Sequence, residues 1–164
     1  GIGLEQEMIE MADRDEKNEQ GQIAYLQGFA QAINQADNFM VELEADGKPL
    51  LNQSVSSVVI ANAAPITSLL AQGGGEPDPT DGYLDVTWID ATEQTVERIA
   101  GIAELAITGL TSLKADSRVH HVRAKKVSIT TTPLKKYVID GEVFDAAPIE
   151  IDVQPKSLHV LIPE

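Results

Sequence analysis

The stretch VHHVRAKKVSITTTPLKKYVIDGEVFDAAPIEIDV, residues 119–153, decides the fold class. Apolar and polar residues alternate along it, and Pro, Gly and Asp interrupt the alternation every few residues. A period of two is typical of strands with one buried face, and such interruptions are typical of turns. Together with the residues that follow, the stretch predicts five short strands: VHHVRA (119–124), KVSITT (126–131), KYVID (136–140), PIEIDV (148–153) and SLHVLI (157–162).

The residues upstream predict helices. Apolar side chains recur at steps of three and four within residues 18–36, which gives one apolar stripe of a helix. We expect a shorter helix at residues 3–13 and one further helix near 92–108, where Asp90 or Thr92 is placed to cap its first turn.

Three more strands are expected between these helices. Alternating residues on both sides of Asp46-Gly47 predict a hairpin, and β-branched runs at 54–65 and 83–89 predict two further strands. Helices followed by a β meander indicate an α+β fold. We therefore expect one mostly antiparallel, β-sandwich-like domain over residues 1–164.

Charge and composition exclude some function classes. The 164 residues carry 26 acidic and 12 basic side chains, a net charge of −14, which repels nucleic acid. Seven of the twelve bases lie within residues 114–136, as expected either for a contact with an anionic ligand or surface or for a solvated strand face. The absence of cysteine excludes disulfides and thiolate metal sites and is typical of a cytoplasmic protein.

The acidic loop EPDPTDGYLD, residues 76–85, is a candidate cation site. Asp78, Asp81 and Asp85 cluster there, and the prolines stiffen the chain between them. Hard cations bind several oxygen ligands, including backbone carbonyls that a tight loop turns inward. The residues alone leave two interpretations open: a divalent-cation loop or a plain acidic turn.

The hairpin signal YVIDGEVF, residues 137–144, carries two acids, Asp140 and Glu142. Residues two apart on an extended chain share a face, so both carboxylates could serve one metal or one proton transfer. An ordinary solvated Asp-Gly turn is the alternative. The neighbouring pair His120-His121 lies on an expected strand and faces opposite sides, so we interpret both as surface or packing residues.

Several segments, in order, resemble one known family. They are GIG (1–3), KNEQGQIAYLQGF (17–29), VELEADGKPL (41–50), VVIANAAP (58–65), TDGYLDV (80–86), VIDGEVF (138–144) and VQPKSLHVLIPE (153–164). The series resembles the C-terminal domain of the diacylglycerol kinase and sphingosine kinase superfamily, in its bacterial lipid-kinase branch. The resemblance covers essentially the whole chain.

The resemblance implies half of a two-domain, ATP-dependent lipid kinase. The N-terminal domain of such a kinase carries a Gly-Gly-Asp-Gly-Thr nucleotide motif, which does not occur in these 164 residues. That domain would make most of the contacts with ATP. The family's Mg²⁺ site falls on Asp78, Asp81 and the carbonyl of Tyr83, and its catalytic acids fall on Asp140 and Glu142. The implied partners are the chain's own N-terminal domain, a lipid substrate and, transiently, a membrane surface.

Other function classes stay open from the sequence. One alternative is a non-enzymatic β-sandwich module that binds a divalent cation or an anionic ligand. Another is a structural module that assembles a homo-oligomer. Because phosphoryl transfer needs a phosphate-binding loop that is not present here, we expect the isolated 164 residues to have no kinase activity.

Overall fold

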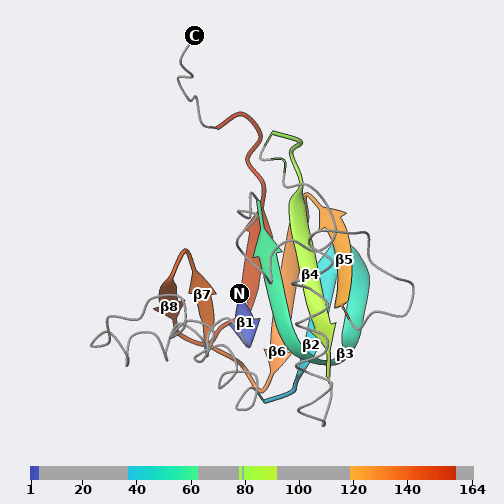
Figure 1. Cartoon of the computed structure of the whole chain (residues 1–164), viewed down its shortest axis with the longest axis vertical. Helices are drawn as coiled ribbons and strands as arrows, with labels where there is room; N and C mark the ends of the chain where they lie inside the picture. Colours follow the sequence, from blue (N-terminus) through green and yellow to red (C-terminus); the bar gives the residue numbers. More distant parts are fainter. Residues whose placement is uncertain (4–36, 63–77, 79, 92–118, 158–164) are drawn as a thin grey trace, which may run out of the picture.

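A computed structural model describes residues 1–3, 37–62, 78, 80–91 and 119–157 of the chain (Figure 1). Nine strands lie within these ranges: β1 (Ile2–Gly3), β2 (Phe39–Ala45), β3 (Lys48–Ala61), β4 (Leu84–Asp90), β5 (Val119–Ala124), β6 (Lys126–Thr132), β7 (Tyr137–Ile139), β8 (Glu142–Phe144) and β9 (Ile149–Asp152).

The nine strands form one large sheet and one small one. The large sheet has the order β5-β4-β3-β2-β6-β9, and β1 pairs with β3 beside this path. Strands β7 and β8 form a separate two-stranded sheet, which lies next to β1 (Figure 1). Every pairing is antiparallel. The expected antiparallel architecture is therefore confirmed.

Strand β3 lies at the centre of the large sheet and pairs with three other strands, β1, β2 and β4. Its first half pairs with β2 and its second half with β4, and Val55 faces Phe39 on one edge and Asp90 on the other. At Ser57 and Val58, β4 occupies one edge of β3. Strand β1 therefore pairs along the other edge, which β2 occupies at residues 48–55. The first residues of the chain are thus built into the centre of the sheet.

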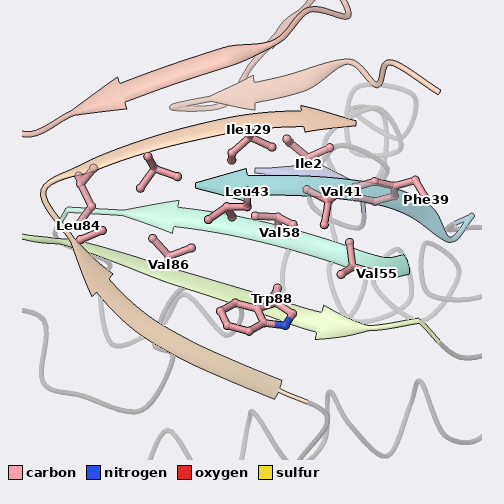
Figure 2. Packing of buried hydrophobic residues seen from close by; sticks show 12 residues of the cluster. Ile2, Phe39, Val41, Leu43, Val55, Val58, Leu84, Val86, Trp88 and Ile129 are labelled. Carbon is pink, nitrogen blue, oxygen red and sulfur yellow. The ribbon is translucent and has the colours of Figure 1, made fainter. Parts of the chain in front are cut away.

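The core follows the alternation in the sequence. On β2, Phe39, Val41 and Leu43 are buried, and Met40 and Glu42 between them are exposed. Removing such side chains from water is the main favourable contribution to folding. The side chains of one buried cluster interdigitate between the strands (Figure 2): Ile2, Phe39, Val41, Leu43, Val55, Val58, Leu84, Val86, Trp88, Ala124, Val127 and Ile129.

Both expected Asp-Gly hairpins are confirmed. Asp46 and Gly47 have φ values of 51° and 74°, and Asp140 and Gly141 have 49° and 89°. Two successive residues with positive φ form the type I′ turn, whose twist matches that of the flanking strands. Asp and Gly are favoured there because Asp tolerates the left-handed region and Gly has no Cβ.

The Asp46 turn also holds the neighbouring hairpin. Asp46 Oδ1 accepts hydrogen bonds from the backbone nitrogens of Lys125 and Lys126, each at 2.9 Å. These two bonds, with that of Lys126 the larger effect, hold the pKa of Asp46 below its ordinary value. The β2–β3 turn and the β5–β6 turn are therefore joined through one carboxylate.

The expected helices remain predictions. Those at 18–36 and 92–108 lie outside the described residues, as does all but the first residue of the one at 3–13. That first residue, Gly3, belongs to strand β1, so the expected start of the helix is wrong. The expected strand at 157–162 lies outside the described ranges except for Ser157. In the described part of the chain, no helix has the length and apolar character needed to span a membrane.

Candidate functional site

The acidic loop before β4 is closed by its own aspartates. Asp78 Oδ1 accepts hydrogen bonds from the backbone nitrogen of Thr80 at 2.8 Å and from its hydroxyl at 2.7 Å. Asp81 Oδ1 accepts one from the nitrogen of Tyr83 at 2.8 Å. The hydroxyl and then the backbone nitrogen of Thr80 hold the pKa of Asp78 below its ordinary value. Each aspartate keeps its second oxygen free of these turn contacts.

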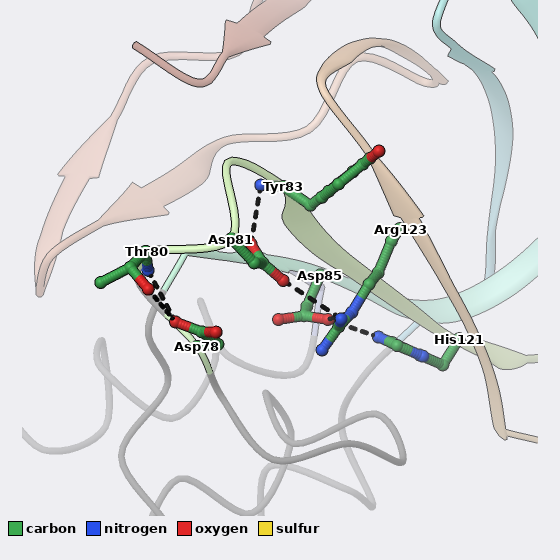
Figure 3. A network of polar contacts seen from close by, with 7 residues as sticks. All are labelled: Asp78, Thr80, Asp81, Tyr83, Asp85, His121 and Arg123. Atoms are coloured by element: carbon green, nitrogen blue, oxygen red, sulfur yellow. Dashed lines mark hydrogen bonds and ion pairs between the residues drawn. The ribbon is translucent and has the colours of Figure 1, made fainter. Parts of the chain in front are cut away.

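Arg123, on β5, joins this loop to the sheet (Figure 3). Its Nη1 lies 3.1 Å from Asp81 Oδ2, and its Nε donates to Asp85 Oδ1 at 3.1 Å. His121 Nε2 lies 2.8 Å from the same oxygen of Asp85. Because the side chains of Asp81 and Asp85 are only 19% and 13% exposed, these pairs are partly shielded from water. We call these four residues the Arg123 network.

The sequence contains little that predicts the Arg123 network. Asp85 and Arg123 are 38 positions apart and become neighbours only because β4 and β5 pair in the register that places them opposite each other. Opposite charges in such directly opposed positions stabilise a sheet. The one sequence signal was the basic residue in an expected strand beside an acidic loop.

The acidic loop fits a metal ion only in part. Its carboxylates and turned backbone are donors of the type that Mg²⁺ prefers. However, within the described ranges no group of three or more His, Asp or Glu side chains is arranged to hold a metal. The Oδ2 atom of Asp81 already faces the guanidinium of Arg123. A cation at Asp78 and Asp81 would therefore share Asp81 with Arg123.

The two adjacent histidines have separate partners, as their opposite facing predicted. His120 Nε2 lies 2.8 Å from Asp90 Oδ2, and the His120 ring stacks on Trp88 with ring centroids 5.1 Å apart. Gln53 donates to the other oxygen of Asp90 at 2.7 Å. His121 instead contacts Asp85. Both histidines thus belong to cross-strand packing on β4 and β5.

The second pair of predicted acids lies at the end of the β7–β8 hairpin. Asp140 occupies the first position of the turn, and Glu142 begins β8 opposite Ile139. Both acids are exposed. The argument that residues two apart share a face does not hold here, because the chain reverses at residues 140–141 and is not extended. The hairpin end and the acidic loop lie at separate places on the domain (Figure 1).

The hairpin is fixed to the start of the chain. Gly1 N donates to Val138 O at 2.8 Å, and Val138 N donates to Gly1 O at 2.8 Å. Strand β1 therefore pairs with β3 on the large sheet and continues into a contact with β7. The exposed acids are carried by a short, anchored element.

The amino-acid sequence of the domain matches a known family. Residues 1–162 match the model described as the YegS C-terminal NAD kinase beta sandwich-like domain. The chain belongs to this family. The resemblance to the bacterial lipid-kinase branch of the diacylglycerol kinases is thereby confirmed.

The curated relatives that match this chain are longer than it is. The Synechocystis protein sll0036, whose name gives no function, is 35% identical over 164 residues, which are 99% of this chain and 37% of that protein. The "Putative lipid kinase SH2167" of Staphylococcus haemolyticus is 26% identical over 166 residues, covering 98% of this chain and 51% of that protein. The chain thus spans only a third to a half of the length of these relatives.

Solved structures share the fold. A crystal structure titled as a "putative diacylglycerol kinase" from Bacillus anthracis superposes with a TM-score of 0.62 at 21% identity, over 85% of this chain and 46% of that one. A second structure with the same description gives a TM-score of 0.58 at 23% identity, over 88% and 46% of the two chains. At these identities the likeness concerns the fold alone.

Proposed function

We propose that this chain is the substrate-side domain of an ATP-dependent lipid kinase that phosphorylates the hydroxyl of a diacylglycerol-like lipid. Membership of the family supports the proposal, as do the lipid-kinase names of relatives that continue beyond this domain. The observation that carries it is the position of Glu142. This carboxylate is exposed on a hairpin that is held at its base by Gly1 and closed by a type I′ turn.

An exposed, anchored carboxylate suits the base of a phosphoryl transfer. Glu142 takes the proton of the lipid hydroxyl while the hydroxyl oxygen bonds to the γ-phosphorus of ATP. The bond between that phosphorus and the oxygen bridging it to the β-phosphorus breaks, which releases ADP. The base must come within about 2.6 to 3.2 Å of the hydroxyl oxygen, which requires a carboxylate outside the core. Asp140, in the adjoining turn, is the second catalytic acid of the proposal, and its exposed carboxylate adds negative charge near Glu142. The ATP is bound by the N-terminal domain of the parent protein.

Asp78, Asp81 and the carbonyl of Tyr83 are the residues that would hold Mg²⁺. A bound Mg²⁺ would supply a fixed positive charge that holds the acidic loop in place. Arg123 already contributes positive charge to the same loop through its pair with Asp81. The role of this loop in the proposal is therefore structural, and the proton transfer belongs to the hairpin.

Contact with a membrane surface is part of the proposal, with the protein cytoplasmic and peripheral. The described bases of the segment 114–136 are largely engaged within the domain. Arg123 pairs with Asp81 and Asp85, Lys125 lies over the Tyr83 ring at 5.2 Å, and Lys126 pairs with Glu150 at 3.2 Å. Because these basic side chains already have partners within the domain, their charge alone would hold the domain at a membrane only transiently.

The experiment that tests the proposal compares the whole protein with its part. The full-length parent, given labelled ATP and diacylglycerol in mixed micelles, should transfer label to the lipid. The isolated 164 residues should transfer none, because they lack the phosphate-binding motif. Failure of the full-length protein to label any hydroxylated lipid would favour the alternative, a non-enzymatic β module that binds a divalent cation or an anionic ligand.

A further inference from the structure

The register of the β7–β8 hairpin sorts its side chains onto two faces. Tyr137 pairs with Phe144, and Ile139 pairs with Glu142, whereas Val138 pairs with Val143 between them. Directly opposed residues share a face, and successive residues alternate. Three apolar side chains and the candidate base therefore lie on one face. We call this the Glu142 face and define it by Tyr137, Ile139, Glu142 and Phe144.

The Glu142 face has two rows of side chains: Tyr137 and Phe144 form one, and Ile139 and Glu142 form the row next to the turn. Tyr137 packs against the main core cluster, and its ring stacks on Phe144 with centroids 5.5 Å apart and planes 9° from parallel. Phe144 is 39% exposed, and Ile139, further toward the turn, is 47% exposed. Exposed apolar side chains grouped on one face, unlike singly scattered ones, are a feature of binding surfaces.

We propose that the Glu142 face binds the apolar chain of the lipid substrate and so places its hydroxyl at Glu142. This inference rests on the proposed function and adds to it the residues that recognise the lipid. A lipid alcohol has the same order of groups as the face: a hydroxyl at one end and hydrocarbon beyond it. Ile139, the direct cross-strand neighbour of Glu142, would contact the hydrocarbon nearest the reacting oxygen.

Charge narrows the lipid class. Glu142 lies on the face itself, the exposed acids Asp140 and Asp145 flank it in the sequence, and residues 137–145 contain no base. Like charges held close together repel, so an anionic phospholipid head group is disfavoured at this face. A hydroxyl group donates a hydrogen bond to a carboxylate without bringing charge of its own. The complementary ligand is therefore an uncharged lipid alcohol.

The competing occupant is protein. The parent continues beyond this domain, and a neighbouring segment of the same protein packed on Ile139 and Phe144 would also cover these apolar side chains. A lipid chain and a protein segment on this face would affect stability and KM differently. Contact with a lipid chain lowers KM more for long-chain than for short-chain substrates, whereas a packed protein segment contributes to stability and to every substrate alike.

The test uses the full-length parent with Ile139→Gln and, as matched control, Val143→Gln. Val143 is also apolar and exposed, at 37%, but lies on the opposite face of the same hairpin. For long-chain diacylglycerol in mixed micelles, Ile139→Gln should raise KM about tenfold, because burial of the isoleucine against hydrocarbon is lost. With a water-soluble short-chain diacylglycerol, which brings less hydrocarbon to the face, the rise in KM should be clearly smaller. Val143→Gln should behave as the wild type with both substrates.

Two results would overturn the inference and leave the lipid kinase in place. One is an unchanged KM of Ile139→Gln for the long-chain lipid. The other is an equal loss of activity with both substrates together with a lowered Tm, which would assign the face to packing within the protein.

A second measurement separates this inference from the proposed function. Binding to neutral phosphatidylcholine vesicles with and without diacylglycerol is followed by co-sedimentation. Binding that depends on diacylglycerol and on Ile139, in a protein that transfers no phosphate, would support the Glu142 face and overturn the kinase. Absence of both binding and phosphate transfer would overturn both.

Discussion

Gly1 and Val138, which are 137 positions apart, exchange two backbone hydrogen bonds of 2.8 Å. Through this pair, the hairpin that carries Asp140 and Glu142 is attached to β1, and β1 is in turn paired to the centre of the large sheet at Ser57 and Val58. The geometry of the candidate catalytic acids therefore depends on how the first three residues pack.

Gly3→Ala should disrupt this attachment. Gly3 has a φ of 86°, and a Cβ there would lie 2.5 Å from Ser56 O and 2.8 Å from Phe39 Cε1. Clash and backbone strain together should lower the free energy of unfolding by about 2 to 4 kcal/mol. Gly47→Ala is the matched control, because its φ is 74° but no atom lies within 4 Å of the added Cβ. Urea unfolding should show the control losing only about 1 to 2 kcal/mol. Equal losses would mean that β1 can adjust to a side chain.

Arg123→Gln should tighten the binding of divalent cations at the acidic loop. The substitution removes the positive charge that pairs with Asp81 and Asp85, so a cation no longer competes with it. Mn²⁺ affinity, followed by electron paramagnetic resonance, should rise about tenfold, and Mg²⁺ should restore part of the lost Tm.

Lys126→Gln serves as the control for that experiment. Lys126 pairs with Glu150, and their side chains are 53% and 71% exposed, so the change should cost no more than about 0.5 kcal/mol and leave Mn²⁺ affinity unaltered. Weaker or unchanged Mn²⁺ binding in Arg123→Gln would show that Asp81 is not a cation ligand that Arg123 competes for.

Asp46 should make stability depend on pH. Backbone hydrogen bonds from Lys126 and Lys125 lower its pKa in the folded state below the ordinary 3.8. A lowered folded pKa means that the stabilisation is fully present above about pH 3.8 and is lost as the pH falls through the folded value. Asp46→Asn keeps the positive-φ turn and the acceptor oxygen but removes the charge. The difference in urea midpoint between wild type and variant should be constant from pH 5 to 7, as pH lies well above the pKa in this range, and should vanish in strong acid. A difference that persists in acid would contradict the assignment.

The sequence predicted local structure well and long-range pairing poorly. The turns at Asp46-Gly47 and Asp140-Gly141 were predictable because their chemistry is contained in two adjacent residues. The pairing of Arg123 with Asp81 and Asp85 was not, because it depends on the register between β4 and β5. The strand at Ile2–Gly3 was also missed, since two residues carry no period and their pairing is decided by distant Ser57 and Val58.

The site residues show the same contrast between predictable local structure and unpredictable long-range pairing. Asp140 and Glu142 were correctly placed at a hairpin end by sequence, yet the argument for a shared face assumed an extended chain that the turn does not provide. That Glu142 shares a face with the apolar side chains of Ile139 and Phe144 follows only from the register of β7 and β8. Both the catalytic and the metal assignments remain predictions.

The most direct test of the account is the kcat of Glu142→Gln in the full-length parent with ATP and diacylglycerol. Glutamine keeps the size of the side chain and cannot accept the proton of the hydroxyl, so kcat should fall by about 10²-fold or more, with Tm unchanged because the residue is exposed. Glu44→Gln, at an exposed position on β2, should keep the wild-type kcat. A kcat of Glu142→Gln near that of the wild type would contradict the assignment of Glu142 as the base and return the hairpin to an ordinary turn.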